Sequence, residues 1–328
     1  MSGACSRRGG PVPDLPVWPQ CNSGCVFCTN PTEGWREATA RFSFARLARR
    51  LKEYKTGSGP LLKFDSAREY FNLTGGEPTL HPEFHKVLAL VRTEFPAALI
   101  RLLTNGRAFA YADFARRAMG IGRTPFELAV PLMGHDARTH DALSRAPGSF
   151  EQTLAGLGNI RRLREPGQRV EIRVVLTRPV VRRLDRLLDW LSSEMGWADR
   201  LVVLFAEFEG SAEVYRDRLL VPVSECGAAL GRCADALARF AEVRLYHFPL
   251  CSLPPRLWPF AWNTLADFKV LYLERCRARC VYREHCVGIH RSYERASGAA
   301  DVHPIEHRRP VSLTGDRYHP VACLLEGR

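Results

Sequence analysis

The chain has 328 residues, of which 46% are hydrophobic, and this size allows one large domain together with a smaller one. A formal net charge of +12 suggests nucleic-acid binding, but only five of the 47 basic residues are lysine. The arginines alternate with leucine in segments such as ARLARRLK, which is typical of solvated helix faces, so nucleic acid is disfavoured as a partner. No apolar run is long enough to cross a membrane and the N-terminus has no secretory signal, so we expect a cytoplasmic protein without membrane contact.

Strand-like and helix-like segments alternate from Pro19 to about Gly210. Apolar residues at helical spacing predict helices over 43–57, 82–96, 109–119, 149–167 and 182–195. Buried-strand patterns cover 69–78, 98–106, 125–134, 169–176 and 200–210, and a short first strand precedes Cys21. This order predicts about six βα units, and therefore a parallel sheet with helices outside it.

The alternation fades beyond Ser211, where the composition changes. Residues 224–243 predict a helix and the following RLYHF predicts a strand. The segment 249–288 is rich in cysteine and proline, which indicates a small second domain. We therefore divide the chain into an N-terminal tail (1–17), a core domain (18–215) and a C-terminal region (216–328).

Three cysteines, Cys21, Cys25 and Cys28, follow the first predicted strand in the loop CNSGCVFC. Three thiolates can hold three irons of a [4Fe–4S] cluster and leave the fourth iron for a small molecule, whereas a structural zinc site needs a fourth protein ligand. A catalytic zinc site with three cysteines is the alternative. The turns TGGEP and TNGR end the next two strands, so these motifs and the cysteine loop share the carboxyl edge where parallel α/β folds bind ligands.

The C-x3-C-x2-C loop with Phe27 before its last cysteine, followed by LTGGEPTL and LLTNGR, resembles the radical S-adenosylmethionine (radical SAM) superfamily. The resemblance implies a partial (β/α)6 TIM-like barrel and a [4Fe–4S] cluster held by Cys21, Cys25 and Cys28, with SAM at the open iron. It also implies reductive cleavage of SAM to a 5′-deoxyadenosyl radical that abstracts a substrate hydrogen, with an electron donor such as flavodoxin or ferredoxin. The residues that it implies in cofactor binding are Phe27, Gly75, Gly76, Glu77, Pro78, Thr104, Asn105 and Arg173. A surface position on an edge strand is the alternative interpretation of Arg173.

A second set of cysteines lies in the C-terminal region, at Cys251, Cys276, Cys280 and Cys286. Four thiolates close the coordination of either a second [4Fe–4S] cluster or a zinc ion. The set resembles the SPASM and twitch subdomains, which hold auxiliary clusters, although its C-x3-C element replaces the usual C-x2-C. Cys226 or Cys233 could substitute as a ligand, but we interpret both as small buried residues of a helix.

Further segments, among them AVPLMGHDARTHDALSRAPGSFEQTLAGLGNI and FPLCSLPPRLWPFAWNTLADFK, resemble the radical SAM maturase of the His-Xaa-Ser peptide system. NTLADFK and CVGIH depart from the SISDWK and CGGFF typical of that maturase. The resemblance implies a ribosomally made peptide as substrate, which the enzyme crosslinks or oxidises. The same chemistry on a nucleoside, sugar or amino acid is the alternative, and a non-enzymatic iron–sulfur or zinc module that binds nucleic acid is a remote one. No catalytic residue is assigned; candidate groups on the substrate side are Glu207, Glu209, Tyr246, His247, Asp267 and Lys269, for which ordinary ion pairs are the alternative.

Overall fold

The structure is a computed structural model that describes residues 14–56, 70–265, 267–316 and 318–325. The described chain forms two compact units, one from Val12 to Arg173 and one that runs from Val174 to the C-terminus. The boundary between the two units, after Arg173, falls inside a strand and within the predicted core domain (18–215). The predicted N-terminal tail lies outside the described residues up to residue 13, and its last residues belong to the first strand.

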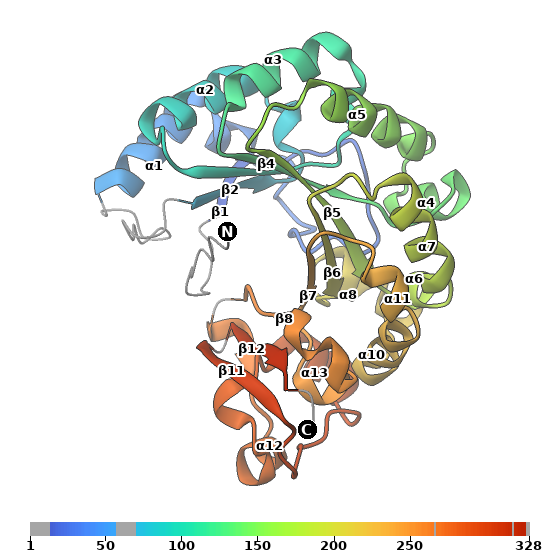
Figure 1. Cartoon of the computed structure of the whole chain (residues 1–328). Helices are drawn as coiled ribbons and strands as arrows, with labels where there is room; N and C mark the ends of the chain where they lie inside the picture. The colour runs from blue at the N-terminus through green and yellow to red at the C-terminus, as the bar shows by residue number, and fades with distance from the viewer. Residues whose placement is uncertain (1–13, 57–69, 266, 317, 326–328) are drawn as a thin grey trace. The chain divides into compact units, whose positions relative to one another are not determined.

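The first unit contains a parallel sheet whose strands are neighbours in chain order (Figure 1). Leu15, Leu73, Leu102, Leu128 and Val170 are paired side by side across the sheet and form one buried apolar row. The strands are β1 (Asp14–Trp18), β2 (Tyr70–Gly75), β3 (Leu99–Leu103), β4 (Phe126–Pro131) and β5 (Gln168–Leu176).

Helices cover the face of this sheet that carries the apolar row. Phe71 shares that face with Leu73, and its ring lies 4.7 Å from the ring of Tyr54 and 4.4 Å from that of Phe95. Tyr54 comes from the first helix and Phe95 caps the second, so aromatic contacts fix both helices on β2. The helices are α1 (Phe44–Thr56), α2 (Phe84–Glu94), α3 (Ala112–Gly122), α4 (Ala137–Ser144) and α5 (Ser149–Leu163), and Figure 1 shows α1, α2, α3 and α5 along the outer side of the strands.

Alternate residues of the same strands carry a polar row on the opposite face. Arg101 of β3 is paired with Glu127 of β4, which in turn is paired with Arg169 of β5. Glu171 and Arg173 continue this face toward the carboxyl end of β5. Arg101, Glu127 and Glu171 of this row are buried, so their charged groups lie on a covered face of the sheet and not at its solvent-exposed edge.

The second unit continues the alternation with three more parallel strands, β6 (Arg200–Phe205), β7 (Val243–Tyr246) and β8 (Ala261–Trp262). The α/β class of the sequence prediction is confirmed, but parallel strands do not stop at six, because β7 pairs with β6 and β8 pairs with β7. Residues 244–246 of β7 were predicted as a strand, while Val243 was predicted as the end of a helix. In contrast, β8 spans only two residues in a proline-rich segment with no readable period. The helices of this part are α6 (Arg178–Val181), α7 (Leu184–Glu194), α8 (Ser211–Val214), α9 (Arg216–Leu219), α10 (Val223–Arg232) and α11 (Ala234–Leu237).

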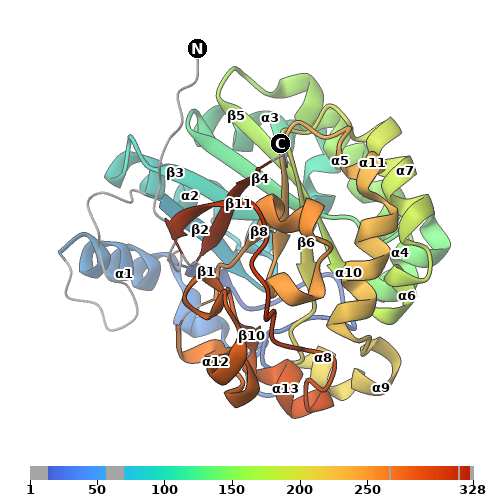
Figure 2. The ribbon, with the colours of Figure 1, turned by 60° about the horizontal axis from the view of Figure 1, so that its bottom comes forward.

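The rest of the second unit consists of short elements that Figure 2 shows in the foreground. β9 and β10 form a two-stranded antiparallel sheet, and β11 and β12 form a second one. Their bounds, with those of the remaining helices, are β9 (Val270–Leu271), α12 (Glu274–Arg279), β10 (Ile289–His290), α13 (Arg291–Ser297), β11 (Val311–Asp316) and β12 (His319–Leu324). Of these elements, β9 and α12 lie within the cysteine-rich segment 249–288. No helix among the described residues is both long and apolar enough to cross a membrane.

Candidate functional site

The cysteine loop follows β1 and brings Cys21, Cys25 and Cys28 together. The amide of Cys28 donates to the carbonyl of Cys25 over 3.1 Å, and the amide of Ser23 donates to the sulfur of Cys21 over 3.4 Å. Burial, reinforced by the neighbouring acidic and thiol groups, raises the pKa of Cys21 to about 11 and that of Cys25 to about 12. Close, buried thiols need a positive partner to ionise, which is what an iron–sulfur cluster supplies, so this donor set fits such a cluster.

The loop is anchored on both sides within the first unit. The amides of Gly24 and Val26 donate to the carbonyls of Ser144 and Leu143 at the end of α4, over 2.9 and 3.0 Å. On the other side, Arg107 donates to the carbonyl of Asn22 and, over 2.7 Å, to Gln152 of α5. Arg107 was missed in the sequence, although its place directly after the TNG turn was a usable signal.

Gly75 and Gly76 let the end of β2 approach the chain just before the cysteine loop. Gly75 has a φ of +127°, and a Cβ there would meet the carbonyl oxygen of Trp18 at 2.4 Å. A Cβ on Gly76 would lie 2.4 Å from the carbonyl oxygens of both Pro19 and Gln20. The lack of a side chain at these glycines therefore lets the protein's own chain approach the end of β2 closely.

Glu77 is a buried carboxylate that joins the ends of β2 and β3. With 1% of its surface exposed, it accepts hydrogen bonds from Thr79, from the hydroxyl of Thr104 over 2.7 Å and from the amide of Asn105 over 2.7 Å. Burial raises the pKa of Glu77, while these donors act in the opposite direction. Pro78 follows as the first residue of a 3-10 helix (Pro78–Leu80), where its missing N–H costs nothing.

Asn105 connects this carboxylate to the cysteine loop. Its side-chain amide donates to Oδ1 of Asn22 over 2.7 Å and lies 4.0 Å from the sulfur of Cys21. Three motifs that are far apart in the sequence therefore meet at one edge of the sheet, as predicted from their positions at successive strand ends. Phe27 is half-buried in the same loop.

Arg173 ends the polar row of β5 and is paired with Pro131 in the register of β4 and β5. Its Nε lies 3.2 Å from the carboxylate of Glu171, and its side chain is mostly buried. The position is inside a paired strand, not on a sheet edge with a solvated side chain. Its predicted role toward SAM is taken up below as a proposal.

The second cysteine set surrounds a cavity of about 360 Å³ in the second unit. All four predicted residues, Cys251, Cys276, Cys280 and Cys286, line this cavity, whereas Cys226 and Cys233 do not. The amide of Gly288 donates to the sulfur of Cys286 over 3.3 Å, and burial raises the pKa of this thiol to about 11. Cys226 and Cys233 are buried at α10 and its carboxyl end, in line with the interpretation of both as small core residues.

The candidate substrate-side residues separate into a polar group and a core residue. Glu207, Glu209, His247 and Lys269 lie close together beyond the ends of β6 and β7. Tyr246 is almost fully buried within β7, so it is a core residue. The side chain of Asp267 lies outside the described residues.

The parallel strands and the three thiols at their carboxyl edge define an α/β protein of the radical-enzyme type, with a ligand site at the strand ends. The chain belongs to the radical SAM superfamily, whose family model matches residues 15–191. Members of this superfamily are enzymes, and membership implies a [4Fe–4S] cluster and SAM as cofactors.

The sequence of the chain is similar to parts of two named proteins. The chain is 37% identical over 98 residues to the AdoMet-dependent heme synthase of Methanosarcina barkeri, a match that covers 29% of this chain and 26% of that protein. It is 30% identical over 159 residues to the GTP 3′,8-cyclase of Paenarthrobacter nicotinovorans, which covers 47% of this chain and 41% of the relative. The chain thus spans less than half the length of each of these relatives.

Among solved structures, the chain is similar to native anSMEcpe with bound AdoMet and Cp18Cys peptide. The TM-score is 0.51 at 14% identity, and the match covers 72% of this chain and 63% of that one. At this identity the likeness establishes a shared fold.

Proposed function

We propose that this chain cleaves SAM reductively and uses the resulting radical to modify a ribosomally made peptide, by crosslinking or oxidation. The observation that carries the proposal is the meeting of Cys21, Cys25 and Cys28 with the Glu77–Asn105 contact at one sheet edge. With SAM bound, the cluster would supply the electron that breaks the sulfonium bond and leaves a 5′-deoxyadenosyl radical. The protein's own part is to hold, orient and shield these groups.

Each residue near the cysteine loop has a distinct proposed task. The three thiolates would hold three irons, which leaves one iron without a protein ligand for SAM. Thr104 and Asn105 would present polar groups to SAM, together with the backbone of Gly75 and Gly76 and with Pro78. Phe27 would cover the cluster from the loop itself.

Glu77 would take part in binding SAM, and it would also hold the strand ends around the site in place. Its two carboxylate oxygens already accept hydrogen bonds from Thr79, Thr104 and Asn105. We infer that it fixes the strand ends that present the other SAM contacts. Arg173, held by Glu171, would offer its guanidinium to the SAM carboxylate or to the substrate.

The four cysteines around the cavity of the second unit would hold an auxiliary [4Fe–4S] cluster, with zinc as the alternative. A reconstituted chain with two clusters contains about eight irons, and Cys286→Ala is expected to lower the content toward about four. The cluster of the first unit should persist in this variant, because its ligands come from the other unit. Iron and zinc analysis of the anaerobically reconstituted protein, with Mössbauer spectra, measures both values; zinc in place of the second set of irons would exclude the auxiliary cluster.

A peptide substrate is supported by two observations of different kinds. The sequence resembles the His-Xaa-Ser maturase over several segments, and anSMEcpe, which shares the fold, was solved with a peptide. The alternative, a small metabolite, is supported by the similarity to a heme synthase and a GTP cyclase. With the superfamily established, the non-enzymatic nucleic-acid module is not retained.

Isotope transfer separates these alternatives. With dithionite as reductant, the chain is expected to form 5′-deoxyadenosine, and a deuterated precursor peptide should pass deuterium into it. Deuterium transfer from a metabolite but not from a peptide would replace the peptide proposal by its alternative, and no 5′-deoxyadenosine at all would refute both. Flavodoxin or ferredoxin would then be tested in place of dithionite, as cytoplasmic donors suited to a cytoplasmic enzyme.

A further inference from the structure

Two guanidinium groups hold the short segment between the first two cysteines of the loop. Arg107, which directly follows the TNG turn, donates to the carbonyl of Asn22 and, over 3.4 Å, to the hydroxyl of Ser23. Arg36, which follows the cysteine loop in the chain, donates to the carbonyl of Ser23 over 3.3 Å. The proposed radical chemistry assigns no task to these two side chains, to which we refer as the arginine pair.

Arg107 is held in a defined place beside the loop. Oε1 of Gln152 accepts a hydrogen bond from its Nε over 2.7 Å, and Oδ1 of Asn105 accepts one from its backbone amide over 3.0 Å. Asn105 also donates to the side chain of Asn22, so that Asn22 is held through its side chain as well as through its carbonyl. Because Arg107 is half-buried and bound on several sides, its charge stays close to the loop.

Ser23 connects both arginines to a cysteine sulfur. Its carbonyl binds Arg36, its hydroxyl binds Arg107, and its amide donates to the sulfur of Cys21 over 3.4 Å. Burial raises the pKa of Cys21 and of Cys25, and the charge of Arg36 acts in the opposite direction on both. This guanidinium therefore lies within electrostatic range of two of the three sulfurs.

All groups that accept hydrogen bonds from the guanidinium groups of the arginine pair are uncharged. These acceptors are the carbonyls of Asn22 and Ser23, the hydroxyl of Ser23 and the amide oxygen of Gln152. In the part of the chain that the structure describes, neither Arg36 nor Arg107 forms an ion pair with a carboxylate. Since a charge that is partly shielded from water is normally paired with one of opposite sign, an anionic group is expected beside the loop.

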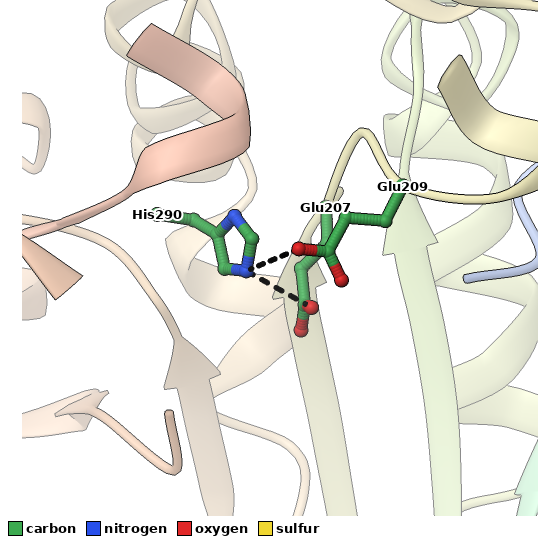
Figure 3. A group of neighbouring side chains, drawn as sticks. All are labelled: Glu207, Glu209 and His290. Atoms are coloured by element: carbon green, nitrogen blue, oxygen red, sulfur yellow. Dashed lines mark ion pairs between the residues drawn. The ribbon is translucent and has the colours of Figure 1, made fainter. Parts of the chain in front are cut away.

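Charged groups at the strand ends of the second unit differ in this respect, because the protein itself supplies their partners. Nε2 of His290 lies 3.3 Å from Glu207 and 3.7 Å from Glu209 (Figure 3), and Nζ of Lys269 lies 2.8 Å from Glu209. The amide of Ser292 donates to Nδ1 of His290, so the ring presents its Nε2–H to the two carboxylates. These ion pairs are complete within the protein, whereas the arginine pair has no carboxylate of its own.

We propose that Arg36 and Arg107 are positioning residues for the SAM-binding cluster, which hold its loop in place and stabilise its reduced form through their positive charge. This inference rests on the proposed function, in which the three cysteines of the loop hold that cluster. Three thiolates outweigh the positive charge of the oxidised iron–sulfide core, and one electron from the donor adds a further negative charge without transfer of a proton. A cation beside such an anion favours the reduced form and thus raises the reduction potential.

Arg107→Gln tests the effect of charge, because glutamine keeps a hydrogen-bond donor and removes the positive charge. A potentiometric titration of the reconstituted holoenzyme, followed through the EPR signal that responds to added SAM, measures this cluster apart from an auxiliary one. We expect the reduction equilibrium to shift about tenfold toward the oxidised form, which for one electron is about 59 mV more negative. Arg36→Gln should shift it in the same direction by a smaller factor, because Arg36 is exposed and solvent screens its charge.

Arg107→Lys separates this electrostatic effect from a purely structural clamp, which is the competing interpretation. Lysine keeps the charge but lacks the planar fork that binds two groups at once. We expect a potential close to that of the wild type, whereas a structural clamp predicts that lysine is as damaging as glutamine. Arg162→Gln is the matched control: Arg162 also donates to an uncharged side chain, that of Asn159, but lies about 15 Å farther along α5 than Gln152, so the potential should not change.

Equal potentials in the wild type, Arg107→Gln and Arg36→Gln at equal iron content would overturn the proposal. Loss of the loop cluster from both Arg107 variants, with an unchanged potential in Arg36→Gln, would also overturn it, since the arginines would then only hold the loop. Failure of the proposed function is detected in the wild type instead, as the absence of a SAM-responsive cluster or of 5′-deoxyadenosine, and this inference would fail with it. Intact wild-type chemistry with unshifted variants would refute this inference alone.

Discussion

Cys25→Ala is expected to abolish dithionite-dependent 5′-deoxyadenosine formation, to below about 1% of the wild-type rate. The three cysteines of the loop would supply all protein ligands of the SAM-binding cluster, so no spare thiolate replaces a missing one. Burial and the neighbouring thiols raise the pKa of Cys25 to about 12, so its thiolate needs the positive charge that a bound cluster would supply. The measurement is product formation by chromatography, together with the iron content of the reconstituted variant.

Two other cysteines provide matched controls for that loss. Cys323 is exposed on β12, and Cys226 is fully buried on α10. Cys323→Ala is expected to retain both iron and activity, and Cys226→Ala is expected to retain them with a modest loss of stability. If Cys25→Ala kept its iron and formed 5′-deoxyadenosine, the loop could not be the SAM-binding site.

Much of the fold could be predicted from the sequence, because the spacing of apolar residues that indicates a helix or a strand is read from a short stretch of chain. Strand β3 lies within the predicted segment 98–106, and α5 starts at Ser149, the first residue of the predicted helix 149–167. Two-residue strands are different: β8 consists of Ala261 and Trp262, and no period can be read from two residues. Its place beside β7 depends on tertiary pairing, which composition does not encode.

The residues of the candidate site also divide into those that the sequence could predict and those that it could not. The cysteines and the glycine turns were predicted because metal ligation and positive φ restrict residue type. The contact of Asn105 with Asn22, 83 residues apart, leaves no such mark, because many polar residues could make an equivalent hydrogen bond. His290 was likewise not singled out, since its ion-pair partners Glu207 and Glu209 follow a strand that is far away in the sequence.

A network of buried ion pairs lies on one face of the sheet of the first unit. Arg101 contacts the carboxylate of Glu127 and lies 3.7 Å from that of Glu171, and the side chains of all three are at most 7% exposed. Arg169 approaches Glu127 from outside at 3.9 Å, and Arg173 approaches Glu171 at 3.2 Å. Two carboxylates in the sheet interior are thus held by one fully enclosed guanidinium with partial help from two others.

Arg101→Met is therefore expected to lower the free energy of unfolding by about 3–5 kcal/mol, because it removes the enclosed cation and leaves both carboxylates buried. Guanidinium-induced unfolding of the reconstituted protein measures this loss. Arg116→Met is the matched control: Arg116 pairs with Asp113 on the exposed face of α3, where solvent screens the pair and little should change. Replacing Arg101, Glu127 and Glu171 together by apolar residues of similar size should recover part of the stability, since the two buried carboxylates are then gone, while Arg169 and Arg173 lose these ion-pair partners. Equal unfolding midpoints for Arg101→Met and the wild type would show that water reaches these carboxylates, and that the network contributes nothing to the sheet that carries Arg173.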